Sequence, residues 1–190
     1  MSALAPQLLS ALLRALWAGH SSQRARVIQA LSRLDEGTLS GPPVSGTFRR
    51  LLSGESDALC RGVGELVHRK RLSVYAADLV ELLPHSAERR AWAAAWLRRL
   101  PLGARARASL LALIVDESLS LDARRAGLCV LAPPRSAWGR APAADLTPEE
   151  RVALLPAFSH EELHLDLLRV LGEVDEALVE AAIEANRVAG

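Results

Sequence analysis

The sequence predicts an all-α fold, a right-handed α-solenoid of about five stacked helical hairpins with a terminal capping helix. Five helical segments end on a similar apolar step, and their closing leucines are 35, 31, 34 and 40 residues apart. A recurrence of this length is typical of stacked helical units, and no window shows the alternation of a strand. We expect all five closing leucines to be buried: Leu31, Leu66, Leu97, Leu131 and Leu171.

Composition indicates a single domain spanning residues 1–190. Half of the residues are apolar but only 4% are aromatic, so the core must be built from Leu, Ala and Val. Cys60 and Cys129 lie far apart, which favours reduced, buried thiols in a cytoplasmic protein. Gln7 and Arg14 interrupt the first apolar run, so we expect an amphipathic helix there and not a signal peptide. No segment is long enough to span a membrane, and no cofactor is expected.

Start and stop signals divide the chain into about eleven helices. The first is expected over 6–17 and is ended by Gly19. Ser22 is interpreted as the cap of the second helix, and Gly41 to Pro43 as a loop. From the second helix onward, the expected helices in this part of the chain are 22–34, 47–52, 56–67, 72–83, 86–100, 110–115 and 123–131.

Residues 133–146 form a Pro- and Ala-rich irregular segment, and acidic helices follow over 147–190. Thr147 begins one of them, with Pro148 at the first helical position and Glu150 at the third. Residues 159–162 repeat this capping pattern. A final helix, over roughly 175–188, is expected to close the stack as a polar cap.

Residues 116–131 resemble the turn and second helix of a HEAT-type repeat. In that family an acidic turn precedes an arginine and small residues, and a leucine-rich helix follows. Residues 23–34 and 57–67 are weaker matches, and the resemblance extends over about residues 20–172. It implies a scaffold or adaptor, since most members bind other proteins and a minority bind or repair DNA. The matching residues carry no catalytic motif, so no catalytic position is transferred.

Charge is distributed unevenly along the chain. Residues 1–140 contain 20 basic and 11 acidic side chains, whereas residues 141–190 contain 3 basic and 11 acidic side chains. The basic repeats over 1–132 and the acidic C-terminal part therefore either pack against each other or serve separate partners.

A non-catalytic protein–protein interaction through the arginines of the middle repeats is the favoured function. The alternative is nucleic-acid binding, in which Trp92 and Trp96 would stack on bases, as in the HEAT-like DNA glycosylases. Against it, these tryptophans have the spacing of core residues, and Arg98 and Arg99 complement the helix dipole. The candidate partner-binding residues are Arg89, Arg90, Arg98, Arg99, Arg105, Arg107, Arg124 and Arg125.

The segment His160 to His164 matches the H-E-x-x-H pattern of zinc hydrolases, in which two histidines share one face of a helix. Glu184 lies at a distance compatible with a third ligand. A capping box from Ser159 to Glu162 explains the same residues without a metal, and we expect no bound metal. Elsewhere, two mid-helix glycines are expected to allow close helix packing: Gly62 and Gly64.

Overall fold

The protein is helical over the residues that the structure, a computed structural model, describes: 6–132 and 145–172. These two ranges contain no β-strand, which confirms the all-α prediction. Three short 3-10 segments lie at Ser73–Tyr75, Leu155–Ser159 and Glu161–Leu163. The α-helices of the described ranges are α1 (Pro6–Ala18), α2 (Ser21–Leu31), α3 (Glu36–Ser40), α4 (Pro42–Leu52), α5 (Asp57–Arg69), α6 (Ala76–Val80), α7 (Ala87–Leu97), α8 (Ala104–Val115), α9 (Leu121–Leu131), α10 (Pro148–Ala153) and α11 (His164–Leu171).

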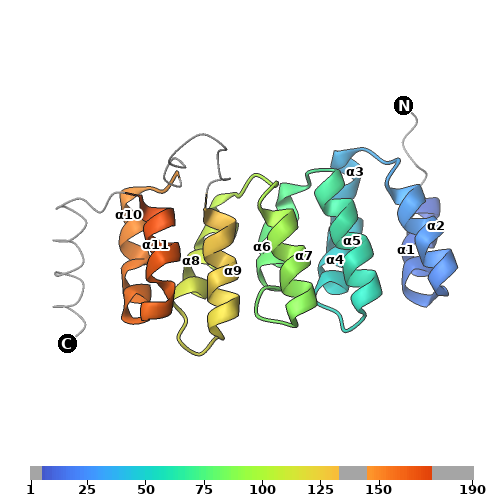
Figure 1. The fold of residues 1–190 in the computed structure, drawn as a ribbon. Helices are drawn as coiled ribbons and strands as arrows, with labels where there is room; N and C mark the ends of the chain where they lie inside the picture. The colour runs from blue at the N-terminus through green and yellow to red at the C-terminus, as the bar shows by residue number, and fades with distance from the viewer. Residues whose placement is uncertain (1–5, 133–144, 173–190) are drawn as a thin grey trace, which may run out of the picture.

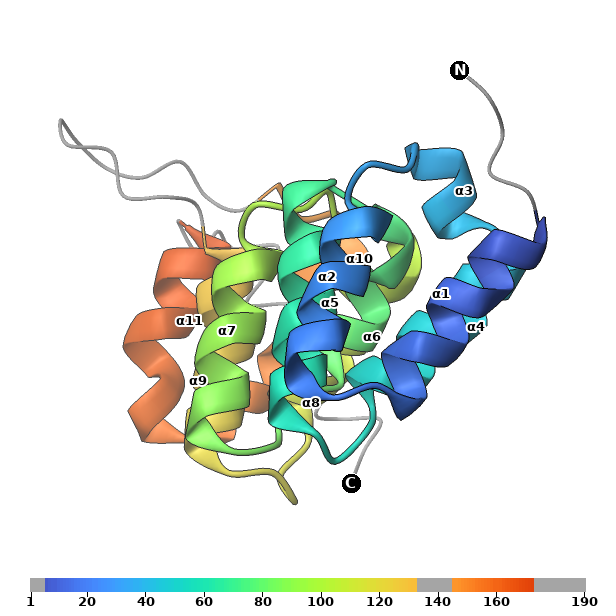
Figure 2. The same cartoon turned by 90° about the vertical axis from the view of Figure 1, so that its right-hand side faces the viewer.

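The helices alternate between two layers in chain order (Figure 1). The first layer holds α1, α4, α6, α8 and α10, and the second layer holds α2, α5, α7, α9 and α11. Within each layer every helix packs against the next one, and successive helices such as α4 and α5 or α8 and α9 pack across the layers. Figure 2 views this row from the end at which α1 and α2 lie. The main contacts of each pair are therefore with the pairs before and after it in the chain.

One apolar cluster runs through both layers from α1 to α11. The five leucines that mark the recurrence are all buried within it, as predicted. The two mid-helix glycines of α5 also lie where close packing was expected. A Cβ atom on Gly62 would lie 2.6 Å from Cδ1 of Ile28, and one on Gly64 would lie 2.1 Å from the Trp96 ring. Glycine thus lets α5 fit between α2 and α7.

Local capping explains where several helices begin. The hydroxyl groups of Ser86 and Ser120 accept hydrogen bonds from backbone N–H groups in the first turns of α7 and α9. Thr147 and Glu150 form the predicted capping box of α10, with Pro148 at a position where its missing N–H is not needed. The predicted starts of α7 and α10 are thereby confirmed, whereas α9 begins at Leu121, two residues before the expected position 123.

Four other local predictions are wrong. The segment Gly41 to Pro43 is not a loop, because Gly41 caps α4 and the two prolines occupy its first turn. The helix expected over 22–34 ends at Leu31, and the side chain of Asp35 accepts from Thr38 N at 2.9 Å and caps the additional helix α3. The helix expected over 72–83 is reduced to a 3-10 turn and the short α6. Ser22 lies inside α2, whose N-cap is His20.

Tyr75, the only tyrosine of the chain, is fully buried beside α3 and α4. Its hydroxyl donates to the Leu39 carbonyl at 2.6 Å, and its ring lies 5.6 Å from that of Phe48. Burial raises the pKa of Tyr75 to about 12, because the phenolate would lose its hydration. The predicted polar cap over 175–188 and most of the irregular segment 133–146 lie outside the described residues.

Candidate functional site

Arg89 joins two neighbouring helices of the second layer. From the first turn of α7, its Nε donates to Asp57 Oδ1 of α5 at 2.6 Å, and its Nη2 donates to the Glu55 carbonyl at 2.9 Å. Only 9% of the Arg89 side chain is exposed. The expectation that this arginine is free for a partner is therefore wrong, because its guanidinium is already used between α5 and α7.

The same kind of link continues along the second layer. Nη1 of Arg90 in α7 lies 3.4 Å from Asp122 Oδ2 of α9. Nε of Arg125 in α9 donates to Asp166 Oδ2 of α11 at 3.2 Å, and its Nη2 donates to the Glu162 carbonyl at 3.0 Å. Together with the Arg89 link, these contacts join α5, α7, α9 and α11 in series. Arg90 and Arg125 thus hold the layer together.

The side chains of Arg107 and Arg124 also have partners inside the fold. Arg107 of α8 forms a two-pronged ion pair with Glu150, the capping residue of α10. This hydrogen-bonded pair lowers the pKa of Glu150 and raises that of Arg107. Arg124 is 1% exposed, and its Nε donates to the Ile114 carbonyl at 2.6 Å. Like Arg89, Arg124 is buried. The prediction that it contacts a partner is therefore wrong.

The remaining three candidates are exposed: Arg98, Arg99 and Arg105. Arg98 and Arg99 follow the last turn of α7, where positive charge complements the helix dipole as expected. Arg105 lies in the first turn of α8, within electrostatic reach of Asp78, whose pKa is raised by burial. The side chains of these three make no hydrogen bond or ion pair with another described residue.

Arginines at the C-terminal ends of α5 and α7 form one basic edge, which comprises Arg69, Arg71, Arg98 and Arg99. Two of these arginines, Arg71 and Arg99, act electrostatically on the same histidine, His68. Burial lowers the pKa of His68, and the positive charges of Arg99 and Arg71 lower it further. The nucleic-acid alternative needs these arginines and the tryptophans on one surface, but Arg89 and Arg98 lie at opposite ends of α7 and Trp96 is buried.

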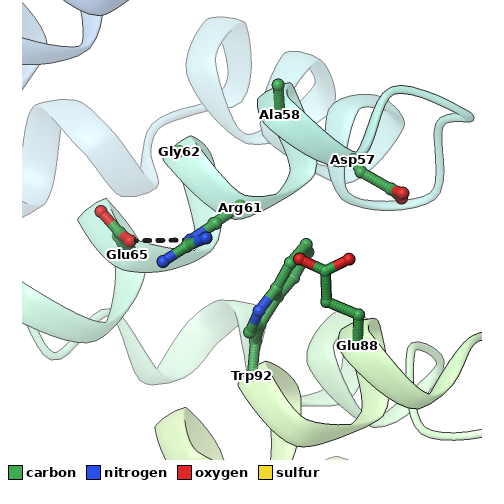
Figure 3. Close-up of a pocket in the computed structure, with 7 residues that line it drawn as sticks. All are labelled: Asp57, Ala58, Arg61, Gly62, Glu65, Glu88 and Trp92. Atoms are coloured by element: carbon green, nitrogen blue, oxygen red, sulfur yellow. Dashed lines mark hydrogen bonds and ion pairs between the residues drawn. The ribbon is translucent and has the colours of Figure 1, made fainter.

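A hollow of about 480 Å³ opens between α5 and α7 on the second layer (Figure 3). Trp92 of α7 stands half-buried within it, although its spacing from Trp96 had suggested a core position. The Arg61 guanidinium of α5 lies 5.4 Å from the centroid of the Trp92 ring. Acidic and small residues complete the lining: Asp57, Ala58, Gly62, Glu65 and Glu88.

Two side chains of the hollow, those of Arg61 and Trp92, already have intramolecular contacts before any partner arrives. Arg61 Nε donates to Glu65 Oε1 at 3.2 Å, one turn further along α5. The ring of Trp92 packs at 6.2 Å from that of Trp96, which is anchored in the core against Gly64. Because these groups are already ordered, a partner would incur little ordering cost on binding.

The two histidines of the H-E-x-x-H segment do not share a helix face. His160 precedes α11 in extended conformation, a 3-10 turn follows, and His164 is the first residue of α11. Nε2 of His164 lies 2.7 Å from the Phe158 carbonyl, whereas Nε2 of His160 lies 3.4 Å from Glu117 Oε1. Within 6–132 and 145–172, no three His, Cys, Asp or Glu residues are grouped as metal ligands would be. Glu184 lies outside these ranges.

The capping box expected from Ser159 to Glu162 is also wrong. Ser159 ends a 3-10 segment, and its hydroxyl donates to the Pro156 carbonyl at 2.8 Å and to Glu117 Oε1 at 3.1 Å.

Both cysteines are free thiols. Cys60 is buried, which raises the pKa of its thiol, whereas Cys129 is exposed, contrary to expectation. Among the residues described, no helix combines the length and the apolar character required to cross a bilayer.

No protein-family model matches the chain, and a search of curated proteins finds no similar sequence. The function must therefore be inferred from the surface itself.

Most residues of the hollow were not among the sequence candidates. Arg61 and Glu65 are four residues apart, as are Glu88 and Trp92, so each pair lies on one helix face. An ion pair on one helix face and a carboxylate one turn before a tryptophan on another are the local signals that could have indicated the hollow. What no local pattern indicates is that the two pairs face each other across α5 and α7.

Proposed function

We propose that this chain is a right-handed, HEAT-like α-solenoid that acts as a non-catalytic adaptor and binds another protein through its second layer. The observation that carries this proposal is the hollow around Trp92, which is formed by second-layer helices alone. A half-buried tryptophan surrounded by polar residues has the character of an interface hot spot. The lining contains no serine, cysteine or histidine, which favours recognition over covalent chemistry.

The order of helices supports the solenoid part of the proposal. Helices that alternate between two layers, with each helix pair packed mainly on the pairs before and after it, leave one side of every second-layer helix uncovered. The arginine links between α5, α7, α9 and α11 fix the spacing of these helices. A partner would therefore meet a surface that is set before binding.

The test is site-specific photo-crosslinking in cells of the native host. A photoreactive residue at Ala58, in the hollow, should crosslink one protein partner, whereas the same residue at exposed Ala112 of the first layer should not. The crosslink should disappear in a Trp92→Ala variant. Trp17→Ala is the matched control, because Trp17 is also exposed and carries an arginine, Arg50, 5.4 Å from its ring. Equal crosslinking at both positions, or none that depends on Trp92, contradicts the proposal.

The basic edge supports a second candidate function, nucleic-acid binding. Its arginines are exposed, and two of them, Arg99 and Arg71, lie close enough to His68 to add to the lowering of its pKa that burial causes. If the edge contacts phosphates, removing Arg98 and Arg99 should lower the slope of log affinity against log salt by about 1.8. Arg14→Ala, on exposed α1, is the control. No binding to single- or double-stranded oligonucleotides at about 50 mM salt rejects this function.

A further inference from the structure

We infer that the hollow receives a basic side chain of the partner, an arginine or a lysine, on the side of Trp92 that faces away from Arg61. This inference rests on the proposed function and specifies the chemistry that its site selects. It draws on the charges of the lining, on the position of the indole and on what each charged group already contacts.

The lining has more acidic than basic groups. Three carboxylates, those of Asp57, Glu65 and Glu88, surround a single guanidinium, that of Arg61. Glu65 is paired with Arg61, and Oδ1 of Asp57 accepts a hydrogen bond from Nε of Arg89. Glu88 is exposed and makes no ion pair with any residue in the described ranges. One carboxylate at the rim therefore has no counter-charge, and a second, on Asp57, remains half exposed with a side-chain exposure of 56%.

The indole separates the occupied side of the hollow from the acidic side. Figure 3 shows Arg61 on one side of the Trp92 ring, and Glu88 and Asp57 beyond the other side. Arg61 already demonstrates that this ring is positioned to accept a cation, at 5.4 Å from its centroid. A second cation on the opposite side would contact the indole and lie beside the free carboxylate of Glu88.

Other partner chemistries fit this position less well. An acidic side chain would be brought against Glu88 and Asp57, and like charges in contact disfavour binding. An apolar side chain would cover the indole but remove water from Glu88 without supplying a hydrogen bond or a charge. A cationic group satisfies both the ring and the carboxylate.

The inference is tested with a minimal probe, the blocked peptide acetyl-Gly-Arg-Gly-amide. Binding is followed by NMR on the indole N–H signal of Trp92, which a Trp92→Phe variant identifies among the four tryptophans of the chain. The signal should shift and saturate with the arginine peptide. It should respond far less to the citrulline analogue, which has the same shape without the charge, and to the glutamate analogue.

Glu88→Gln is the decisive variant, because Glu88 is exposed and makes no contact on which folding depends. Loss of this exposed charge pair should weaken the arginine peptide about two- to fivefold. Glu81→Gln, an exposed carboxylate of the first layer, should leave the affinity unchanged. Equal binding of the citrulline peptide, or an unchanged affinity in Glu88→Gln, overturns the inference.

The two proposals fail in different ways. If Ala58 crosslinks a partner whose contact segment lacks arginine and lysine, the inference about basic side chains is wrong and the adaptor function stands. If the arginine peptide binds but no Trp92-dependent crosslink forms in cells, the adaptor function is wrong.

Discussion

Each end of α7 carries two consecutive arginines, but the two pairs differ in what they contact. Arg89 and Arg90 lie in its first turn and reach carboxylates of α5 and α9. Arg98 and Arg99 follow its last turn and remain exposed. The two pairs are separated by nine positions, which is roughly 14 Å along a helix. An arginine in this protein is therefore structural or available depending on the helix end at which it lies.

The helix dipole explains this difference. The N-terminal end of a helix favours acidic side chains, and Asp57, Asp122 and Asp166 occupy the first turns of α5, α9 and α11. An arginine at the start of α7 or α9 thus finds a carboxylate on a neighbouring helix of its layer, before or after it in the chain. The C-terminal ends present carbonyl groups, which attract cations without neutralising them. Arginines at that edge keep a full charge for an external partner.

The largest effect is expected from the core, at Leu97, the last residue of α7. Leu97 of α7 is 1% exposed, and Leu97→Ala should lower the free energy of unfolding by about 2–5 kcal/mol because it leaves a cavity. Urea denaturation followed by circular dichroism measures this change. A loss below about 0.5 kcal/mol would mean that the leucine recurrence does not mark the core.

The buried phenol of Tyr75 should make stability depend on high pH. Its pKa is raised from 10 to about 12, so the folded state favours the neutral phenol. This contribution is complete below about pH 10 and is lost as the pH rises from 10 to 12, which amounts to about 2–3 kcal/mol. Absorbance at 295 nm follows this single tyrosine directly. Ionisation near pH 10 in the folded protein would contradict its burial.

Arg89→Ala should cost about 1.5–3 kcal/mol, since a buried guanidinium loses its charged hydrogen bonds to Asp57 and the Glu55 carbonyl. Asp57→Asn should also destabilise the protein, and the double variant should cost less than the sum of the two. Chemical denaturation of the four proteins in this cycle gives the coupling. Strict additivity would show that the two residues do not act together.

The smallest effect is expected at the other end of the same helix. Arg98→Ala and Arg99→Ala should each change the free energy of unfolding by no more than about 0.5 kcal/mol, because both side chains are exposed and unpaired among the described residues. The same denaturation assay as for Arg89 provides the comparison. Equal losses for Arg89 and Arg98 would remove the distinction between the two ends.

The sequence predicted those features that depend on local patterns. The all-α class followed from the recurring leucines, and the starts of α7 and α10 followed from Ser86 and Thr147, whose side-chain hydrogen bonds close within three residues. The start of α9 was placed two residues late, at 123, although Ser120 caps this helix in the same way. The start of α4 was missed because two prolines after a glycine also fit a loop. The cap at Ser159 failed because a 3-10 segment that contains Pro156 uses the serine hydroxyl instead.

The roles of the arginines depend on contacts that no local pattern contains. Arg89 meets Asp57 across 32 positions of the chain, and Arg107 meets Glu150 across 43. Sequence alone therefore grouped buried, paired and free arginines as one set. The spacing of helix pairs brings the distant carboxylates to these guanidinium groups, so the distinction becomes visible only in the folded arrangement.

The distinction between structural and available arginines can be measured in one experiment. Phenylglyoxal modifies accessible guanidinium groups, and mass spectrometry of the intact and fragmented protein reads every arginine at once. Arg98, Arg99 and Arg105 should react in the native protein at nearly the rate of the denatured chain. Arg89 and Arg124, which are 7% and 1% exposed, should react only after unfolding. If Arg89 reacted as fast as Arg98 in the folded protein, the distinction between structural arginines at one end of α7 and available arginines at the other would be wrong.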